Sequence, residues 1–402
     1  MNKDKIVSID DQEVEEWFRE EEESSITENQ VGSPKPVNED ISQKYSNTQL
    51  RIVRTNLDYS IDYLKSSLGN SIDLEPQYQR RSRWDTKKRS SLIESLLLNI
   101  PIPPIFLFEI EYGQYEVVDG RQRLETLKDF LDNLFPLKNL EYWNELNGKR
   151  FKELPTIIQR GLLRRTVSAT VLLAETTQAT ESDVDVRMVL FNRLNTGGVQ
   201  LNPQELRNAL YDGHFNNMLI SASRSDIFTS IWGIPNRTET EESDPPKELI
   251  NNALYRSMAD CELVLRFFAI RETILNDLKG SLKSLLDKTI KKHKNDGKAD
   301  VARDETLFLT TLSELNNLFD NRPFILPELN KPSRSLYDAL MVAYSILDKS
   351  IIDNKTNINT KLLQRLSMSN KYDILVGRAN SIDAIKLRVN EAKEILSITE
   401  SE

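Results

Sequence analysis

The sequence has few of the residues that build disulfides and metal sites. Its 402 residues include one cysteine and two histidines. A single cysteine cannot form an internal disulfide, so the cytoplasm is the expected location. Structural zinc sites take several Cys or His ligands, and an HNH nuclease needs paired histidines in a metal finger. Both classes are therefore nearly excluded.

Long apolar runs and a P-loop are also missing. The longest apolar stretch, LLLNIPIPPIFLF, is interrupted by Asn99 and three prolines and is too short for a membrane helix. The first residues contain no apolar segment of the kind that a signal peptide needs. Neither Gly148-Lys149 nor Gly297-Lys298 is followed by the Ser or Thr of a P-loop. We therefore expect no membrane contact, and any nucleotide must bind without a P-loop.

The negative charge is confined to the N-terminal end of the chain. The net charge is −9, and residues 1–40 contain 13 acidic and 4 basic residues, so the rest of the chain is balanced. High charge with few apolar residues favours disorder. We predict that residues 1–48 form an acidic tail and a disordered linker that folding does not require. The tail is either a solubilising segment or a docking peptide or nucleic-acid mimic that covers a basic groove.

A strand followed by a helix organises the central part of the sequence. The apolar run Tyr115–Val118 ends at Asp119-Gly120, and Leu124, Leu127 and Leu131 then recur at i, i+3 and i+7. This spacing is typical of an amphipathic helix with one face in a core. The pattern predicts that the helix begins directly after the glycine.

The first turn of this predicted helix carries Arg121, Gln122 and Arg123. Backbone N–H groups in a first turn lack helical partners, and cations there oppose the helix dipole. An anion bound between the arginines would reverse that penalty, which favours a phosphate site. The other interpretation is that Asp119 is an ordinary N-cap and the arginines are solvated.

A basic cluster precedes this region. Residues 79–89 contain six Lys or Arg and one Asp, and the tryptophan among them can stack on a base beside phosphate-binding cations. The predicted nucleic-acid contacts are Arg83, Trp84, Lys87, Lys88 and Arg89. The alternative is a solvated helix entrance, for which Asp85 would be the N-cap.

Four motifs, taken together, resemble the N-terminal domain family of GmrSD-type restriction proteins, within the ParB/sulfiredoxin-like superfamily. They are Gln79-Arg80 followed by Trp84, Pro101-x-Pro103-Pro104, Asp119-Gly120-x-Gln122-Arg123, and Asn195-x-Gly197-Gly198. Arg121 replaces the first glutamine of the usual Asp-Gly-Gln-Gln-Arg signature. The resemblance covers roughly residues 50–270.

The resemblance implies an α+β fold, with a small mixed sheet in a ParB/sulfiredoxin-like domain followed by helices. The expected domains are the nucleotide-binding domain at 49–215, a helical extension at 216–290, a connector at 291–303 and a helical domain at 304–402. The resemblance also implies a bound NTP, either ATP or GTP, and Mg²⁺ held by Asp119. The expected catalytic residues are Asp119 and Arg123, and the expected nucleotide-binding residues are Gln79, Arg80, Gly120, Arg121, Gln122 and Asn195.

Two further residues, Arg207 and Cys261, could belong either to a site or to the fold. Asn202, Pro203 and Glu205 give a strong helix-start signal, and Arg207 follows within that helix. Arg207 could face the nucleotide pocket with Asn195, or it could form a salt bridge. Cys261 lies on an apolar stripe, which indicates a core thiol.

The leading hypothesis is an NTP-binding and NTP-hydrolysing module of a bacterial anti-phage or restriction-type defence system that senses DNA. A separate nuclease or effector and a homo-oligomer are the expected partners. The alternative is a non-catalytic, nucleotide-sensing regulator or antitoxin that controls a separately encoded nuclease. A stand-alone nuclease ranks third, because no cluster of several carboxylates is visible.

Overall fold

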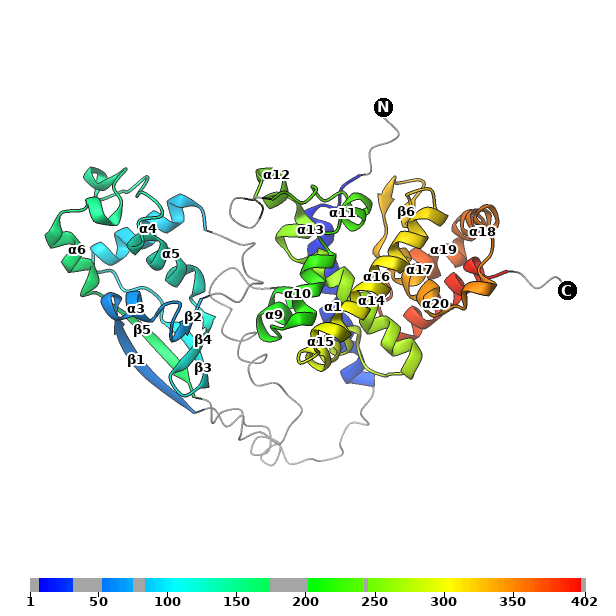
Figure 1. Cartoon of the computed structure of the whole chain (residues 1–402), viewed down its shortest axis with the longest axis horizontal. Coiled ribbons are helices and arrows are strands. Elements are labelled where there is room, and N and C mark those ends of the chain that lie inside the picture. The colour runs from blue at the N-terminus through cyan, green and yellow to red at the C-terminus, as the bar shows by residue number, and fades with distance from the viewer. Residues whose placement is uncertain are drawn as a thin grey trace. The chain divides into compact units, whose positions relative to one another are not determined.

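The chain divides into two compact units, which we describe separately. The computed structural model describes residues 7–31, 53–74, 84–173, 202–239, 241 and 245–398. One unit, the α/β unit, is Val37–Leu201. The other, the helical unit, combines Met1–Pro36 with Asn202–Glu402. The α/β unit is therefore inserted, in sequence, between the first helix of the helical unit and the rest of it (Figure 1).

The α/β unit contains a mixed five-stranded sheet with the strand order β1-β5-β3-β4-β2. The strands are β1 (Arg54–Ser60), β2 (Ile72–Asp73), β3 (Ile105–Glu111), β4 (Gln114–Asp119) and β5 (Thr166–Leu172). Strand β5 pairs antiparallel with β1 and parallel with β3, while β4 pairs antiparallel with β3 and parallel with β2. Strands β3 and β4 form a hairpin that turns at Gly113, whose φ of 76° suits a tight turn.

Helices cover one face of this sheet (Figure 1). They are α3 (Ile61–Ser67), α4 (Thr86–Leu97), α5 (Arg121–Leu131) and α6 (Thr156–Leu163), with short 3₁₀ turns at Asn144–Leu146 and Phe151–Glu153. The shared core includes Leu64, Ile93, Leu107, Leu127 and Phe130, each at most 1% exposed. The sequence expectation for α5 is confirmed, since its apolar stripe lies in this core.

The helical unit consists of packed helices and one short hairpin. Its helices are α1 (Asp11–Val31), α9 (Pro203–Leu210), α10 (His214–Ala222), α11 (Asp226–Trp232), α12 (Lys247–Ile250), α13 (Ala253–Arg256), α14 (Ala259–Asn276), α15 (Leu282–His293), α16 (Lys298–Leu318), α17 (Arg334–Ile346), α18 (Lys355–Ser367), α19 (Ser369–Val376) and α20 (Ile382–Leu396). The hairpin strands are β6 (Ile325–Leu326) and β7 (Lys331–Pro332). Cys261 is fully buried in α14, which confirms a core thiol. The predicted α+β class, a small mixed sheet followed by helices, is confirmed.

The structure corrects the expected acidic tail. Helix α1 lies among the helices of the helical unit (Figure 1), and Val14, Phe18 and Glu21 on one of its faces are at most 8% exposed. The i, i+4, i+7 spacing of these residues is amphipathic, but the run of glutamates around them made the segment look solvated. Residues 11–23 are therefore part of a folded unit rather than of an unstructured tail.

The structure also corrects the expected boundaries farther along the chain. Helix α15 ends at His293 and α16 begins at Lys298, so only four residues of the predicted 291–303 connector separate the two helices. The first turns of α16 bury little besides Val301, which is why their polar sequence resembled a loop. Helix α9, expected in the nucleotide-binding domain, belongs to the helical unit. No helix in the described ranges combines the length and the hydrophobicity that crossing a membrane would require.

Candidate functional site

The turn between β4 and α5 depends on a glycine. Strand β4 ends at Asp119, and Gly120 is the N-cap of α5 with φ 93° in the left-handed region. A Cβ at this position would lie 2.5 Å from Ile105 Cγ2. Glycine is therefore required both by the backbone conformation and by the close approach of β3. The interpretation of Asp119 as the N-cap is wrong, because the left-handed turn puts Gly120 there and no side chain caps the helix.

Arg123 joins two of the sequence motifs. Its Nη2 donates to Asp119 Oδ2 at 2.8 Å, while Nη1 donates to the carbonyl oxygens of Pro103 and Pro104, the latter at 3.3 Å. The guanidinium is 11% exposed. Hydrogen bonds to a charged donor are stronger than neutral ones, so Arg123 ties the proline motif to the Asp-Gly turn. Arg123 is thus a positioning residue, with its charge already matched by Asp119.

Arg121 differs from Arg123 because one of its N–H groups donates no hydrogen bond to the described residues. Its Nε donates to Glu125 Oε1 at 2.7 Å, one turn along α5. Its side chain is 9% exposed, yet Nη1 is buried and finds no hydrogen-bond partner among the described residues. An unpaired buried donor costs about 1–3 kcal/mol, and more when it is charged. A cationic donor in this state, in the first turn of a helix, suits an anionic ligand.

The remaining predicted nucleotide-binding residues divide into two groups. Gln122 is half-buried in the first turn of α5, and its carbonyl accepts from Thr126 Oγ1 at 2.7 Å. Gln79, Arg80 and Asn195, and Arg83 of the basic cluster, lie outside the described residues.

Part of the basic cluster is committed to the fold. The predicted cap is confirmed, since Asp85 accepts from the backbone N–H of Lys88 at 2.7 Å. Arg89 donates to Asp129 Oδ2 at 2.5 Å, and its guanidinium lies 3.9 Å from the ring centre of Phe135. Arg89 therefore holds α4 against α5 and is not a free phosphate ligand.

Two lysines of the cluster stay exposed. These are Lys87 and Lys88, and Lys88 Nζ lies 5.5 Å from the ring centre of Trp84. This pair of cations beside an aromatic ring keeps the chemistry expected of a nucleic-acid contact.

The exposed lysines and the Asp119–Arg123 turn lie toward opposite ends of α5. The Arg89–Asp129 ion pair places the start of α4 beside the last turns of α5. Asp129 is eight residues beyond Arg121, which corresponds to about 12 Å at roughly 1.5 Å per helical residue. The predicted nucleic-acid contacts Lys87 and Lys88 therefore lie away from the predicted nucleotide site at the turn.

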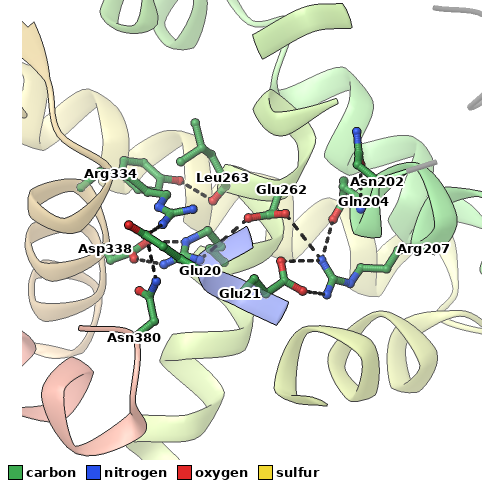
Figure 2. Close-up of polar contacts among 12 residues, drawn as sticks. Glu20, Glu21, Asn202, Gln204, Arg207, Glu262, Leu263, Arg334, Asp338 and Asn380 are labelled. Atoms are coloured by element: carbon green, nitrogen blue, oxygen red, sulfur yellow. Dashed lines mark hydrogen bonds and ion pairs between the residues drawn. The ribbon is translucent and has the colours of Figure 1, made fainter. Parts of the chain in front are cut away.

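The sequence did not predict a buried network of charged residues in the helical unit (Figure 2). Arg207 is fully buried; its Nε pairs with Asp287 at 2.7 Å, its Nη2 with Glu21, and its Nη1 with Glu262 at 3.6 Å. Arg207 is therefore a salt-bridge residue, which decides between its two interpretations. The capping box of α9 is confirmed, since Asn202 and Glu205 cap each other's backbone.

The network continues through two further arginines. Arg266 on α14 pairs with Asp338 on α17, and Arg334 donates to Glu20 at 2.7 Å. The sequence did contain a signal for this network. In the segment CELVLRFFAI of α14, charged residues stand among apolar residues that leave the helix no polar face. Such residues must be paired in the fold, although the sequence does not say with which partner.

Burial and charge shift the titration of the network. Burial and the neighbouring carboxylate of Glu21 raise the pKa of Glu262 to about 7. Burial also opposes ionisation of Glu21, but the charge and hydrogen bond of Arg207 outweigh it and lower the pKa of Glu21 below its usual value. Glu21 is the anion that Arg207 holds, and Glu262 is the group that takes up a proton near neutrality.

Comparison with known proteins identifies one part of the chain. Residues 62–211 match the family model described as the GmrSD restriction endonuclease, N-terminal domain. Comparisons with curated proteins and with solved structures found no match. The matched segment contains the Asp119–Arg123 turn, the proline motif that Arg123 ties to it, and the basic cluster. The resemblance predicted from the motifs is confirmed: over residues 62–211 the chain is similar to the N-terminal domain of GmrSD restriction endonucleases.

Proposed function

We propose that the α/β unit binds an NTP, ATP or GTP, at the turn formed by Asp119–Arg123, and that it hydrolyses the nucleotide within a restriction-type defence system that senses DNA. The observation that carries the proposal is Arg121. Its buried Nη1, in the first turn of α5, has no hydrogen-bond partner within the part of the chain that the structure describes. Phosphate oxygens would complete the donor set of this guanidinium.

Each residue of the turn has a separate role in this proposal. Gly120 supplies the left-handed turn from which α5 begins, and its backbone and the first N–H groups of α5 cradle the phosphate. Arg121 compensates the negative charge of the phosphate. Arg123 holds Asp119 in place, and Asp119, whose side chain is 33% exposed, carries Mg²⁺ or positions water.

Other parts of the proposal rest on the family motifs. Gln79, Arg80, Gln122 and Asn195 are proposed to complete the nucleotide site in a ParB/sulfiredoxin-like domain. A separately encoded nuclease is the proposed partner, because the chain has only two histidines. Assembly as a homo-oligomer belongs to the same proposal.

One observation favours the second candidate function, a regulator that binds a nucleotide without hydrolysing it. Arg123 and Asp119 neutralise each other at 2.8 Å, and Arg123 also holds two carbonyl oxygens. Residues engaged in this way serve geometry more readily than a catalytic step. Turnover measurements separate the two functions.

The test is a calorimetric titration of the full chain with all four NTPs and Mg²⁺, followed by product analysis. Arg121→Ala should weaken NTP binding by about 1.5–3 kcal/mol, the range for hydrogen bonds to charged groups. Lys128→Ala is the matched control, since Lys128 is an exposed cation of the same helix that pairs with Asp132. Equal affinity of Arg121→Ala and the unmodified chain would reject the site. Binding without product would support the regulator.

A further inference from the structure

The corner between α15 and α16 gathers a histidine and carboxylates from three segments. His293 is the last residue of α15, Asp296 lies in the connecting turn, and Asp304 is in the second turn of α16. One ligand atom from each residue, His293 Nδ1 and a carboxylate oxygen of each aspartate, lies within 4.8 Å of the other two. Among the described residues, this is the group with the composition and spacing of a metal site. None of the three belongs to the α5 turn.

We propose that His293, Asp296 and Asp304 bind a divalent transition-metal ion, Mn²⁺ or Zn²⁺. One imidazole nitrogen with two carboxylate oxygens is a mixed ligand set. Imidazole favours transition metals over Mg²⁺ and Ca²⁺, which prefer all-oxygen sites. Three protein ligands leave further positions for water.

The second ring nitrogen of the histidine is held as a metal-binding histidine requires. His293 Nε2 lies 2.8 Å from Glu272 Oε1 on α14. A carboxylate on the far nitrogen keeps a proton on Nε2, so that Nδ1 offers its lone pair to a metal once the proton it shares with Asp296 has left. The ring is also stacked on Phe215, with ring centres 4.5 Å apart and planes 20° apart. Ring orientation is thus set by residues of α10 and α14, independently of the two aspartates.

The ligand distances require only small side-chain movements. Asp296 Oδ2 lies 2.6 Å from Nδ1, a hydrogen-bond distance, and Asp304 Oδ2 lies 4.0 Å from it. Neighbouring ligands of an ion at about 2.1 Å are separated by about 3 Å. Entry of the metal would displace the proton shared by His293 and Asp296, move these two groups slightly apart and draw Asp304 inward.

Surrounding charges and access agree with a bound cation. Glu272, Asp296 and Asp304 bring three negative charges to the corner, which are offset in part by Lys292, at 2.7 Å from Glu272, and by the charge of Arg271 acting on Asp304. The side chains of His293, Asp296 and Asp304 are 14%, 29% and 27% exposed, so an ion can enter without unfolding. The bound metal would clamp α15 to α16 across their four-residue turn.

The experiment is a titration of the chelator-treated full chain with MnCl₂, followed by electron paramagnetic resonance of free Mn²⁺, and with ZnCl₂ by calorimetry. We expect one ion per chain at this corner and a higher Tm with metal. Asp304→Asn should weaken that binding at least tenfold. It should leave the metal-free protein folded, since Asp304 lies beyond hydrogen-bond distance of the ring. Glu272→Gln should weaken binding by about 10–100-fold, the usual effect of removing such a support.

Asp300→Asn is the matched control, because it removes the same charge from the exposed side of α16, where Asp300 pairs with Arg303. It should bind metal as the unmodified chain does. Absence of Mn²⁺ and Zn²⁺ binding, or equal binding by Asp304→Asn and the unmodified chain, would overturn the proposal and leave a purely ionic corner. Metal that binds only with NTP and survives Asp304→Asn would belong to Asp119 instead.

Discussion

The two units use arginine in opposite ways. In the α/β unit, Arg121 pairs with Glu125 and Arg123 with Asp119, each four residues away in the sequence. The carboxylate side chains of both pairs stay partly exposed. In the helical unit, Arg207 pairs with Glu21 across 186 residues, and both side chains are completely buried. Local pairs can rearrange around a ligand without disturbing the core, whereas the distant pair closes the unit around its first helix.

This difference separates arginines that can bind a ligand from arginines that stabilise the fold. Partly exposed ion pairs contribute little to stability, about 0–1 kcal/mol, so a ligand can replace one carboxylate at low cost. A buried arginine that loses its partner is left as an uncompensated charge. We therefore expect substitutions in the helical unit to change stability most, and substitutions in the α/β unit to change binding.

The largest expected effect is the loss of the distant pair. Glu21→Ala should lower the free energy of unfolding by about 3–5 kcal/mol, toward the lower end because Asp287 and Glu262 remain near Arg207. Urea denaturation of the full chain measures it. Glu15→Ala, on the exposed side of α1, is the control and should change stability by less than about 0.5 kcal/mol. Equal effects of the two substitutions would contradict the comparison and return α1 to the status of a tail.

A second prediction uses the pH dependence of the same network. The folded state raises the pKa of Glu262 to about 7 from an ordinary 4.5, so between these values the folded state keeps a proton that the unfolded state has released. Stability should therefore fall as pH rises from about 4.5 to 7, by at most about 1.4 kcal/mol per pH unit for one group.

Glu262→Gln removes the titrating group while keeping its size. The variant should lose stability less steeply over this pH range and should be the more stable protein above pH 7. Thermal unfolding of both proteins from pH 4.5 to 8 measures the difference. If the two curves run parallel, Glu262 ionises normally in the folded protein, and the network is less shielded from water than its burial indicates.

The same contrast explains what could be predicted from the sequence. The α5 turn was found because its determinants are local: an apolar strand, a glycine, and a helix stripe at Leu124 and Leu127. The Glu21–Arg207 pair was missed because it depends on which helices meet in space, and neither residue has a local pattern that names the other. The acidic run was interpreted from its composition alone, although Val14 and Phe18 marked a buried face.

Within the site itself, the residue types were predicted but their engagement was not. Sequence patterns placed Arg121 and Arg123 in one helical turn, and the family motif assigned Arg123 to catalysis and Arg121 to nucleotide binding, without showing which contacts each one makes. Their difference depends on Pro103 and Pro104, whose carbonyl oxygens reach Arg123 from 20 and 19 residues away. The separation of the basic cluster from the turn likewise depends on how α4 packs on α5. Such contacts between elements are absent from any local pattern.

The smallest expected effect concerns the two exposed lysines, and it sharpens the comparison within a single helix. Lys87, Lys88 and Arg89 are consecutive cations, yet among the described residues only Arg89 is held by a carboxylate, Asp129. Replacing Lys87 and Lys88 with Ala should therefore leave stability nearly unchanged. The slope of log K against log salt for duplex DNA binding should become shallower by up to about 0.9 per lost phosphate contact. Lys152→Ala, an exposed lysine elsewhere in the α/β unit, is the control and should keep the slope. Binding that loses the slope only when Arg89 is replaced would mean that the Arg89–Asp129 pair opens for DNA, so that even a pair joining two helices across 40 residues serves recognition. A slope unchanged by the double substitution would remove α4 from the nucleic-acid surface.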